Sequence, residues 1–334
     1  MTSRFVAALG ALLVFGPAVH AADFPVRLPL GLQEQAAYVP DDNPLTADKI
    51  ALGKQFFWDT RWSRNGTIAC VSCHDPNHGW ADPRPVSLRF DGKPTPRHSP
   101  TLVNRLFSDT QQWAGTRTSL EDQALKASDQ TPELLVKHLG AIPEYQTAFQ
   151  KVFGAALNPD GVAKAIAAYE RTILSGNSRY DRFRAGDGTA LSAAARRGLA
   201  LFEGKARCLS CHAGFNFTDE SYHNLGVGMD RPDPDLGRYT VTKREEHKGA
   251  FKTPTLRDVA RHPPYMHDGS VRSLAEVVAL YNRGGTPNPW LSGELRPLGL
   301  SNDEQAELVA FLEALTGEVA AEVTTPPRLP PRAN

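Results

Sequence analysis

Two copies of a five-residue motif constrain this chain of 334 residues more than any other feature. Each copy reads Cys-x-x-Cys-His, at 70–74 and at 208–212, and together the copies hold all four cysteines of the chain. Two thiols three positions apart on a turn can each add to one vinyl group of a haem, and the next residue then offers its imidazole to the iron. The sequence therefore predicts two covalently attached haem c groups, held by Cys70, Cys73, His74, Cys208, Cys211 and His212.

Other uses of four cysteines explain this pattern less well. Two disulfides are common in an exported protein, but they give no reason for the histidine after each cysteine pair. A zinc ribbon brings its cysteine pairs within about 15–20 residues of each other, whereas these pairs lie in opposite halves of the chain. Haem attachment is therefore the favoured interpretation.

The first 21 residues have the composition of a secretory signal peptide. Arg4 supplies a positive charge, residues 5–19 form an apolar run broken only by glycine and proline, and small residues around Ala21 suit a signal peptidase. The apolar run is shorter than the ~20 residues that span a bilayer. We expect cleavage near Ala21, a periplasmic mature protein that starts near Ala22, and no membrane insertion after cleavage.

The charge balance excludes several classes of protein. The chain has 37 Lys and Arg against 37 Asp and Glu, and 22% of its residues are charged. Such a balance argues against disorder, against an acidic tail and against a basic surface for nucleic acid. We therefore expect no nucleic-acid partner.

A helix is predicted on the N-terminal side of each haem motif. Residues 45–57 begin with Thr46 as the N-cap, and residues 191–202 begin near Ser192. In both segments a glycine is followed four residues later by phenylalanine, which puts a small and an aromatic side chain on one helical face. The repeated order of elements suggests an internal duplication.

A closing helix is predicted in each half as well. The second of these begins with a capping box of Ser301 and Glu304 and ends at Gly317. The first ends at Gly176 and carries an apolar stripe of Ile166, Tyr169, Ile173 and Leu174.

We therefore expect an all-α fold of two cytochrome c-like domains related by internal duplication. These domains span residues 22–180 and 181–317, and an extended tail follows over 318–334. Long loops rich in Pro and Gly, such as 82–100 and 226–237, are uncommon unless something else organises them. A large buried cofactor would do so.

Further motifs carry a resemblance to a known family. In chain order they are Ser99 to Asn104, Trp113 to Gly115, Ser119 to Ala124, Phe251 to Arg257 and Pro264 to Ser270. With the two Cys-x-x-Cys-His motifs, the sequence resembles the bacterial dihaem cytochrome c peroxidase superfamily, including its MauG-like branch. The resemblance covers the mature chain to about residue 317. It implies that the N-terminal haem reacts with hydrogen peroxide and the C-terminal haem transfers electrons.

The resemblance makes His74 the proximal ligand of the peroxide-reacting haem. In the cytochrome c peroxidases of the superfamily, a histidine sixteen residues beyond the motif histidine blocks the active iron until the enzyme is reduced. Phe90 occupies that position here, and phenylalanine cannot ligate iron. We expect an open, five-coordinate iron without reductive activation, as in the MauG-like branch; the alternative is that His78 is the ligand.

Gln111 and Glu121 fall on the distal Gln and Glu of the superfamily. Burial against the haem and apolar walls should raise the pKa of Glu121, because burial disfavours the charged carboxylate. Glu121 would take the first proton from bound peroxide and return it to the leaving oxygen, while Gln111 would hold peroxide or water. The alternative is that Glu121 is a solvated helix carboxylate.

For the second haem, the resemblance implies His212 and Tyr281 as iron ligands. Tyr281 matches the position of a methionine ligand in the peroxidases, as it does in MauG-like proteins. A phenolate is hard and anionic, so it should lower the reduction potential. The alternative is an ordinary core tyrosine, with Met266 as the ligand.

The superfamily has a calcium site between its two domains. Its asparagine ligand corresponds to His98, and its two backbone carbonyls would come from His262 and Pro264. Because calcium prefers oxygen ligands and imidazole offers nitrogen, occupation of this site by calcium is doubtful.

The expected function is a periplasmic peroxidase that reduces hydrogen peroxide to water with electrons from a small cytochrome c or a cupredoxin. One alternative is a MauG-like oxidase that uses peroxide to oxidise residues of a partner protein. Ala206 counts against it, because proteins that mature tryptophan tryptophylquinone have a tryptophan two residues before the second motif. Another alternative is a non-catalytic dihaem electron carrier with two six-coordinate irons.

Overall fold

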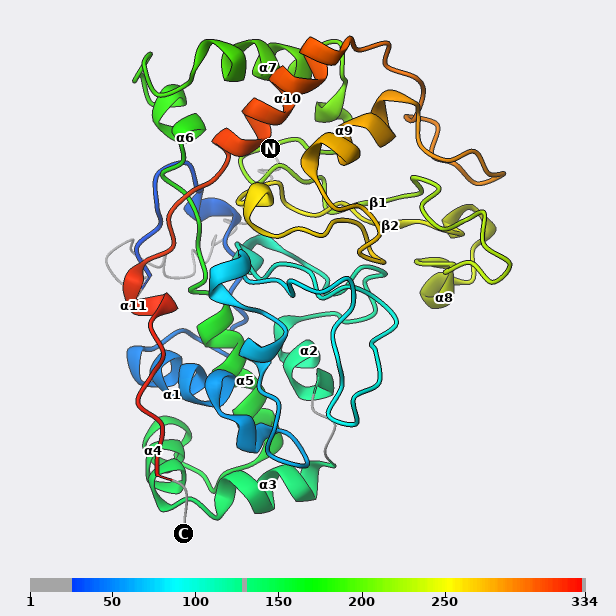
Figure 1. Ribbon diagram of the computed structural model, residues 1–334. Coiled ribbons are helices and arrows are strands. Elements are labelled where there is room, and N and C mark those ends of the chain that lie inside the picture. The colour runs from blue at the N-terminus through cyan, green and yellow to red at the C-terminus, as the bar shows by residue number, and fades with distance from the viewer. Residues whose placement is uncertain (1–25, 128–130, 332–334) are drawn as a thin grey trace, which may run out of the picture.

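The computed structural model describes residues 26–127 and 131–331 (Figure 1). The predicted signal peptide, 1–21, lies outside the described residues. The first half of the chain contains α1 (Ala47–Trp58), α2 (Leu120–Ala127), α3 (Pro132–Gly140), α4 (Pro143–Phe153) and α5 (Pro159–Glu170). The second half contains α6 (Arg179–Arg184), α7 (Ala193–Glu203), α8 (Tyr239–Thr242), α9 (Leu274–Asn282), α10 (Asn302–Ala314) and α11 (Ala321–Thr324).

Within residues 26–127 and 131–331, the strands form one short pair in the second half. The strands β1 (Tyr222–His223) and β2 (Phe251–Lys252) are antiparallel, with Tyr222 opposite Lys252. The helix-rich character predicted from the sequence is confirmed. Within the described residues, no helix combines the length and the apolar character needed to cross a bilayer.

The predicted helix starts are confirmed by their capping hydrogen bonds. The Thr46 hydroxyl accepts from the backbone N–H of Lys49 at 3.3 Å, and the Ser192 hydroxyl accepts from that of Ala195 at 3.1 Å. Ser301 and Glu304 form the expected capping box at the start of α10. These polar side chains satisfy N–H groups that the first turn of a helix leaves without partners.

The same close helix packing occurs in both halves. A Cβ atom at Gly53 of α1 would lie 1.8 Å from the carbonyl oxygen of Ala165 in α5, and one at Gly198 of α7 would lie 1.9 Å from that of Glu307 in α10. Only glycine allows the helices to approach so closely. Figure 1 shows α1 with α5 in the lower part of the molecule and α7 with α10 in the upper part. The recurrence matches the predicted plan, and a common origin of the halves stays a prediction.

The first closing helix ends earlier than predicted. α5 ends at Glu170, so the expectation that Ile173 and Leu174 continue its apolar stripe is wrong, although both side chains are buried. Asn104 explains the early end, because its backbone N–H donates to the carbonyl of Ile173 at 2.8 Å and its side-chain oxygen accepts from the N–H of Ser175 at 2.9 Å. These long-range bonds replace the helical ones.

The segment after residue 317 packs along the first half of the molecule, where Figure 1 shows it in red. It contains the short helix α11, so the prediction of a wholly extended tail is wrong at 321–324. The Tyr169 hydroxyl donates to the carbonyl of Val323 at 2.8 Å, and the side-chain amide of Gln55 donates to that of Arg328 at 3.2 Å. Val323 also joins the hydrophobic core of the first half.

Candidate functional site

The two Cys-x-x-Cys-His motifs fold into the same turn. Each begins with a short 3₁₀ helix, Cys70–Ser72 in the first half and Cys208–Ser210 in the second. The backbone N–H of His74 donates to the carbonyl of Cys70 at 3.0 Å, and that of His212 donates to Cys208 at 2.8 Å. Each turn therefore brings the histidine back beside the first cysteine, as attachment to one haem requires.

The two motif histidines are also oriented in the same way. Nδ1 of His74 lies 3.2 Å from the carbonyl oxygen of Trp80, and Nδ1 of His212 lies 2.9 Å from that of Phe217. Burial lowers the pKa of both imidazoles, to about 4 for His74, so both are neutral at physiological pH. A neutral imidazole that donates from Nδ1 keeps the lone pair on Nε2, which is the form that ligates a metal.

A largely apolar cavity lies beside the second motif. Tyr281 of α9 and Met266 both line it, so the structure brings both candidate iron ligands to the motif. Burial raises the pKa of Tyr281, and the neighbouring thiols of Cys208 and Cys211 raise it further. A tyrosine ligand must therefore lose its proton to the charge of a metal. The wall of this cavity also includes Cys208, Cys211, His212, Phe202, Val278 and Leu312.

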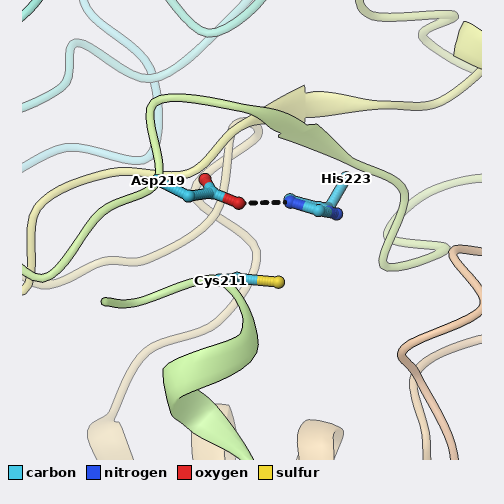
Figure 2. Close-up of side chains that lie close together, drawn as sticks. All are labelled: Cys211, Asp219 and His223. Carbon is cyan, nitrogen blue, oxygen red and sulfur yellow. Dashed lines mark hydrogen bonds and ion pairs between the residues drawn. The ribbon is translucent and has the colours of Figure 1, made fainter. Parts of the chain in front are cut away.

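Asp219 and His223 were not singled out from the sequence, yet they lie next to the second motif. Figure 2 shows His223 hydrogen-bonded to Asp219, with Nε2 2.9 Å from the carboxylate oxygen, and the sulfur of Cys211 close by. The Cys211 sulfur, and then Asp219, raise the pKa of His223 to about 9. A thioether from Cys211 to haem would take that sulfur out of the interaction and leave the histidine–aspartate pair beside the cavity.

Glu121 lies in the first turn of α2 and forms a bidentate ion pair. One carboxylate oxygen accepts from Nη1 of Arg171 at 2.6 Å and from the amide of Asn43 at 2.7 Å, and the other accepts from Nη2 of Arg171 at 3.2 Å. Burial acts to raise the pKa of Glu121, but the hydrogen bonds and charge of Arg171 outweigh it and lower the pKa. The raised pKa expected from the sequence is therefore wrong.

Gln111 is buried in the loop that precedes α2. Its backbone N–H donates to the carbonyl of Arg117 at 2.9 Å, and its side-chain amide donates to the carbonyl of Ser108 at 3.2 Å. Among the described residues, Gln111 makes no hydrogen bond to Glu121. The structure therefore holds Gln111 by both its backbone and its side-chain amide.

Glu170, at the end of α5, has the property that was expected of Glu121. Its side chain is buried, and within the described part of the chain its Oε2 atom has no hydrogen-bond partner. Burial raises the pKa of Glu170 to about 8, against the opposing charge of Arg171. The sequence signal was a glutamate beside an apolar helix stripe, and it was not recognised.

Phe90 and His78 both lie in the loops that follow the first motif. Phe90 is half-buried, with the Arg64 guanidinium carbon 5.3 Å from its ring centroid. The His78 side chain is 44% exposed, and its Nδ1 lies 3.0 Å from the carboxylate of Asp75. A side chain this exposed is poorly placed to reach into a buried haem site, which weakens the alternative that His78 ligates the iron.

The residues of the expected calcium site lie where the two halves meet. His98, His262 and Pro264 line the same cavity, and the His98 imidazole is buried with its Nε2 atom unpaired among the described residues. Imidazole nitrogen is a poor ligand for calcium, which prefers oxygen. The side chains present therefore do not suit a calcium ion.

Comparisons with known proteins point to one family. A family model described as di-haem cytochrome c peroxidase matches residues 47–189. The chain is 43% identical to cytochrome-c peroxidase IdrP1 of Denitromonas iodatirespirans, over 83% of this chain and 84% of that one. It is 42% identical to the methylamine utilization protein MauG of Methylorubrum extorquens, over 87% of this chain and 84% of MauG. A solved MauG-like protein associated with microbial copper homeostasis has a TM-score of 0.81 and 31% identity, over 87% and 96%.

Proposed function

Because this chain belongs to the di-haem cytochrome c peroxidase family, and so is a peroxidase-type oxidoreductase, we propose that it reduces hydrogen peroxide to water in the periplasm. Its electrons would come from a small cytochrome c or a cupredoxin. The observation that carries the proposal is the matched geometry of His74 and His212, each with Nδ1 held by a backbone carbonyl and Nε2 left for a metal.

Two haem c groups are the cofactors of this proposal. Cys70 and Cys73 would bind the first covalently, with His74 as its proximal ligand, and Cys208, Cys211, His212 and Tyr281 would hold the second. The bound haems supply the iron chemistry of peroxide reduction. The buried, apolar cavity beside His212 supports this assignment, because it suits a large apolar ring. The exposure of His78 and the phenylalanine at position 90 support an open first site.

Glu121 is the proposed acid–base group over the first haem. Its lowered pKa means that it is a carboxylate at neutral pH, ready to accept the first proton of peroxide. The guanidinium of Arg171 fixes both carboxylate oxygens, so that the proton is taken and returned at a constant position. Gln111 would hold peroxide or a water molecule beside Glu121 through its side-chain oxygen.

Stopped-flow addition of peroxide to the purified ferric protein tests this function. Glu121→Gln should slow the spectral change by about 10²- to 10⁴-fold, because the positioned base is lost. Glu133→Gln is a matched control, since Glu133 lies in the first turn of α3 on an exposed position. A ferric protein that shows no spectral change with peroxide, or an unaltered rate in Glu121→Gln, would contradict the proposal.

A MauG-like oxidase that acts on a partner protein is the second candidate. The 42% identity to MauG and the tyrosine at position 281 favour it. Ala206 is buried and offers no aromatic ring to carry an electron from a partner to the second haem. The peroxidase and the oxidase are distinguished by mass spectrometry of proteins that are encoded by neighbouring genes, co-expressed with this chain and treated with peroxide. A peroxide-dependent mass change in one of these proteins supports the oxidase.

A further inference from the structure

A cluster of three buried aromatic rings lies beside the motif histidine in each half. The rings are those of Phe57, Trp80 and Tyr169 in the first half and of Phe202, Phe217 and Phe311 in the second. Taken in matching order, the distances between ring centroids are 6.1, 5.2 and 6.4 Å in the first half and 6.0, 5.0 and 6.4 Å in the second. The two clusters therefore have the same arrangement.

One residue of each cluster also holds the motif histidine. The carbonyl oxygen of Trp80 lies 3.2 Å from Nδ1 of His74, and that of Phe217 lies 2.9 Å from Nδ1 of His212. Both residues have a left-handed backbone, with φ of 62° at Trp80 and 52° at Phe217, which is uncommon for a bulky side chain. The same turn therefore presents a carbonyl to the histidine and a ring to the cluster in each half.

The two clusters differ in how readily their rings lose an electron. Indole and phenol are far easier to oxidise than the phenyl ring of phenylalanine. In the second half, phenylalanine fills all three matching positions, so packing alone does not require Trp80 and Tyr169. A fourth ring there, Tyr180, lies 5.2 Å from Phe217 and 5.7 Å from Phe311, and the ring nearest in sequence to the histidine is still phenylalanine.

The cluster of the first half continues to a further oxidisable ring, Trp58 at the end of α1. Its indole N–H donates to the Tyr169 hydroxyl at 3.3 Å. Trp58 is half-buried, whereas Trp80 and Tyr169 are each 1% exposed. A chain of oxidisable rings therefore runs from the carbonyl at His74 to a partly exposed indole.

Tyr169 keeps its proton in this chain. Its hydroxyl donates to the backbone carbonyl of Val323 at 2.8 Å, and an amide oxygen is too weak a base to take a phenol proton. Burial raises the pKa of Tyr169, which disfavours the phenolate as well. Tyr169 therefore connects the two indoles without being oxidised itself, since an indole can lose an electron and keep its N–H.

We propose that Trp58 is the outer end of an electron route that runs through Tyr169 and Trp80 to the first haem and bypasses the second haem. Trp58 gives one electron to the first haem after peroxide has oxidised it, which reduces the haem by one equivalent and leaves the indole as a cation radical. Because Trp58 is half-buried, a small one-electron reductant such as ascorbate returns the electron. The supply of oxidising equivalents by peroxide rests on the proposed function.

Pulse radiolysis of the fully ferrous dihaem protein tests the route without peroxide. Azide radicals take one electron from Trp58, and the ferrous first haem then restores the indole and becomes ferric. We expect a first-order oxidation of the first haem at a rate independent of protein concentration. This phase should be lost in Trp58→Phe, Tyr169→Phe and Trp80→Phe, because each removes one oxidisable ring from the chain.

The second half supplies the reason that two of these variants should fold. Tyr169→Phe and Trp80→Phe introduce the side chain that the second half has at the matching positions, and haem content checks the folding of each variant. Trp290→Phe is the control. Trp290 lies in the second half, with the Lys248 ammonium nitrogen 4.7 Å from its ring centroid, and its removal should leave the first-order phase unaltered.

Peroxide addition without a reductant gives a second measurement. Rapid freeze-quench electron paramagnetic resonance should detect a tryptophan radical that is lost in Trp58→Phe and kept in Trp290→Phe. An unaltered first-order phase in both Trp58→Phe and Tyr169→Phe would overturn the route. If the first-order phase were present and depended on Trp58, but peroxide caused no spectral change, the route would be supported and the proposed function contradicted.

Discussion

The two halves of the molecule share a scaffold and differ in the polar groups around it. In each half, a glycine allows two helices to pack closely, and the motif histidine has Nδ1 at a backbone carbonyl, with Nε2 on the other side of the ring. The first half adds a cluster of charged groups. In it, Glu121 is paired with Arg171, and Glu170 directly precedes Arg171 in the chain. The second half offers Tyr281 in an apolar cavity. The common scaffold suits the same kind of cofactor in each half, whereas the different polar groups suit different chemistry in the two halves.

A buried Arg–carboxylate pair occurs in both halves, and its surroundings differ. Arg257 and Asp181 are each 1% exposed, and Asp181 also accepts from the hydroxyl of Ser178, so this pair is enclosed. Arg171 is 2% exposed but Glu121 is 15% exposed, which leaves part of that carboxylate accessible. The enclosed pair, Arg257 with Asp181, can therefore only stabilise the structure of the second half. In the first half, the carboxylate of the Arg171–Glu121 pair can also contact a ligand.

The largest expected effect comes from removing either arginine. Arg171→Met and Arg257→Met should each lower the free energy of unfolding by about 3–5 kcal/mol, because each leaves a buried carboxylate without its partner. Only Arg171→Met should also move the acid limb of the peroxide reaction to higher pH, since the burial that raises the pKa of Glu121 is then opposed mainly by the hydrogen bond from Asn43. Chemical denaturation and pH-dependent stopped flow measure the two effects.

Arg197→Met is the control for these variants. The Arg197 side chain is 60% exposed, so its ion pair with Glu307 should contribute less than about 1 kcal/mol to the free energy of unfolding. If Arg257→Met moved the acid limb as much as Arg171→Met does, the distinction between the two pairs would be lost.

A smaller effect is expected from Glu170→Gln. The pKa of Glu170 is raised in the folded protein to about 8, above its unfolded value, so the native state holds the proton more tightly. The stability that this proton provides is present below about pH 4.5 and is lost as pH rises through 8. Glu170→Gln should remove this decline and be more stable than the unaltered protein at pH 8, by a few kcal/mol.

Thermal unfolding of the dihaem protein, between pH 5 and pH 8, measures this difference. Glu144→Gln, at an exposed position in α4, is the control and should leave the pH dependence unaltered. Parallel curves for Glu170→Gln and the unaltered protein would show that Glu170 is ionised throughout this range.

The smallest of the three effects concerns the second half alone. Tyr281→Met should raise the reduction potential of the second haem by on the order of 100 mV, because a soft thioether replaces a hard phenolate. Spectroelectrochemistry measures the potential. Met266→Leu is the control, since Met266 lines the same cavity. A potential that responds to Met266→Leu and not to Tyr281→Met would make Met266 the ligand.

What the sequence by itself determined is local. The Cys-x-x-Cys-His turns and the caps at Thr46, Ser192 and Ser301 act within a few residues of the chain. The structure keeps each of them, because a turn or a cap hydrogen bond needs no distant partner.

What only the tertiary structure decided depends on partners far along the chain. The pKa of Glu121 is lowered by Arg171, fifty residues away, although the partial burial of the carboxylate acts to raise it. Asn104 ends α5 early, and Tyr169 holds the tail. His98 and His262, far apart in the sequence, line one cavity in the folded chain. Electrostatic energy and hydrogen bonding depend on distance in space, which a local sequence pattern does not contain.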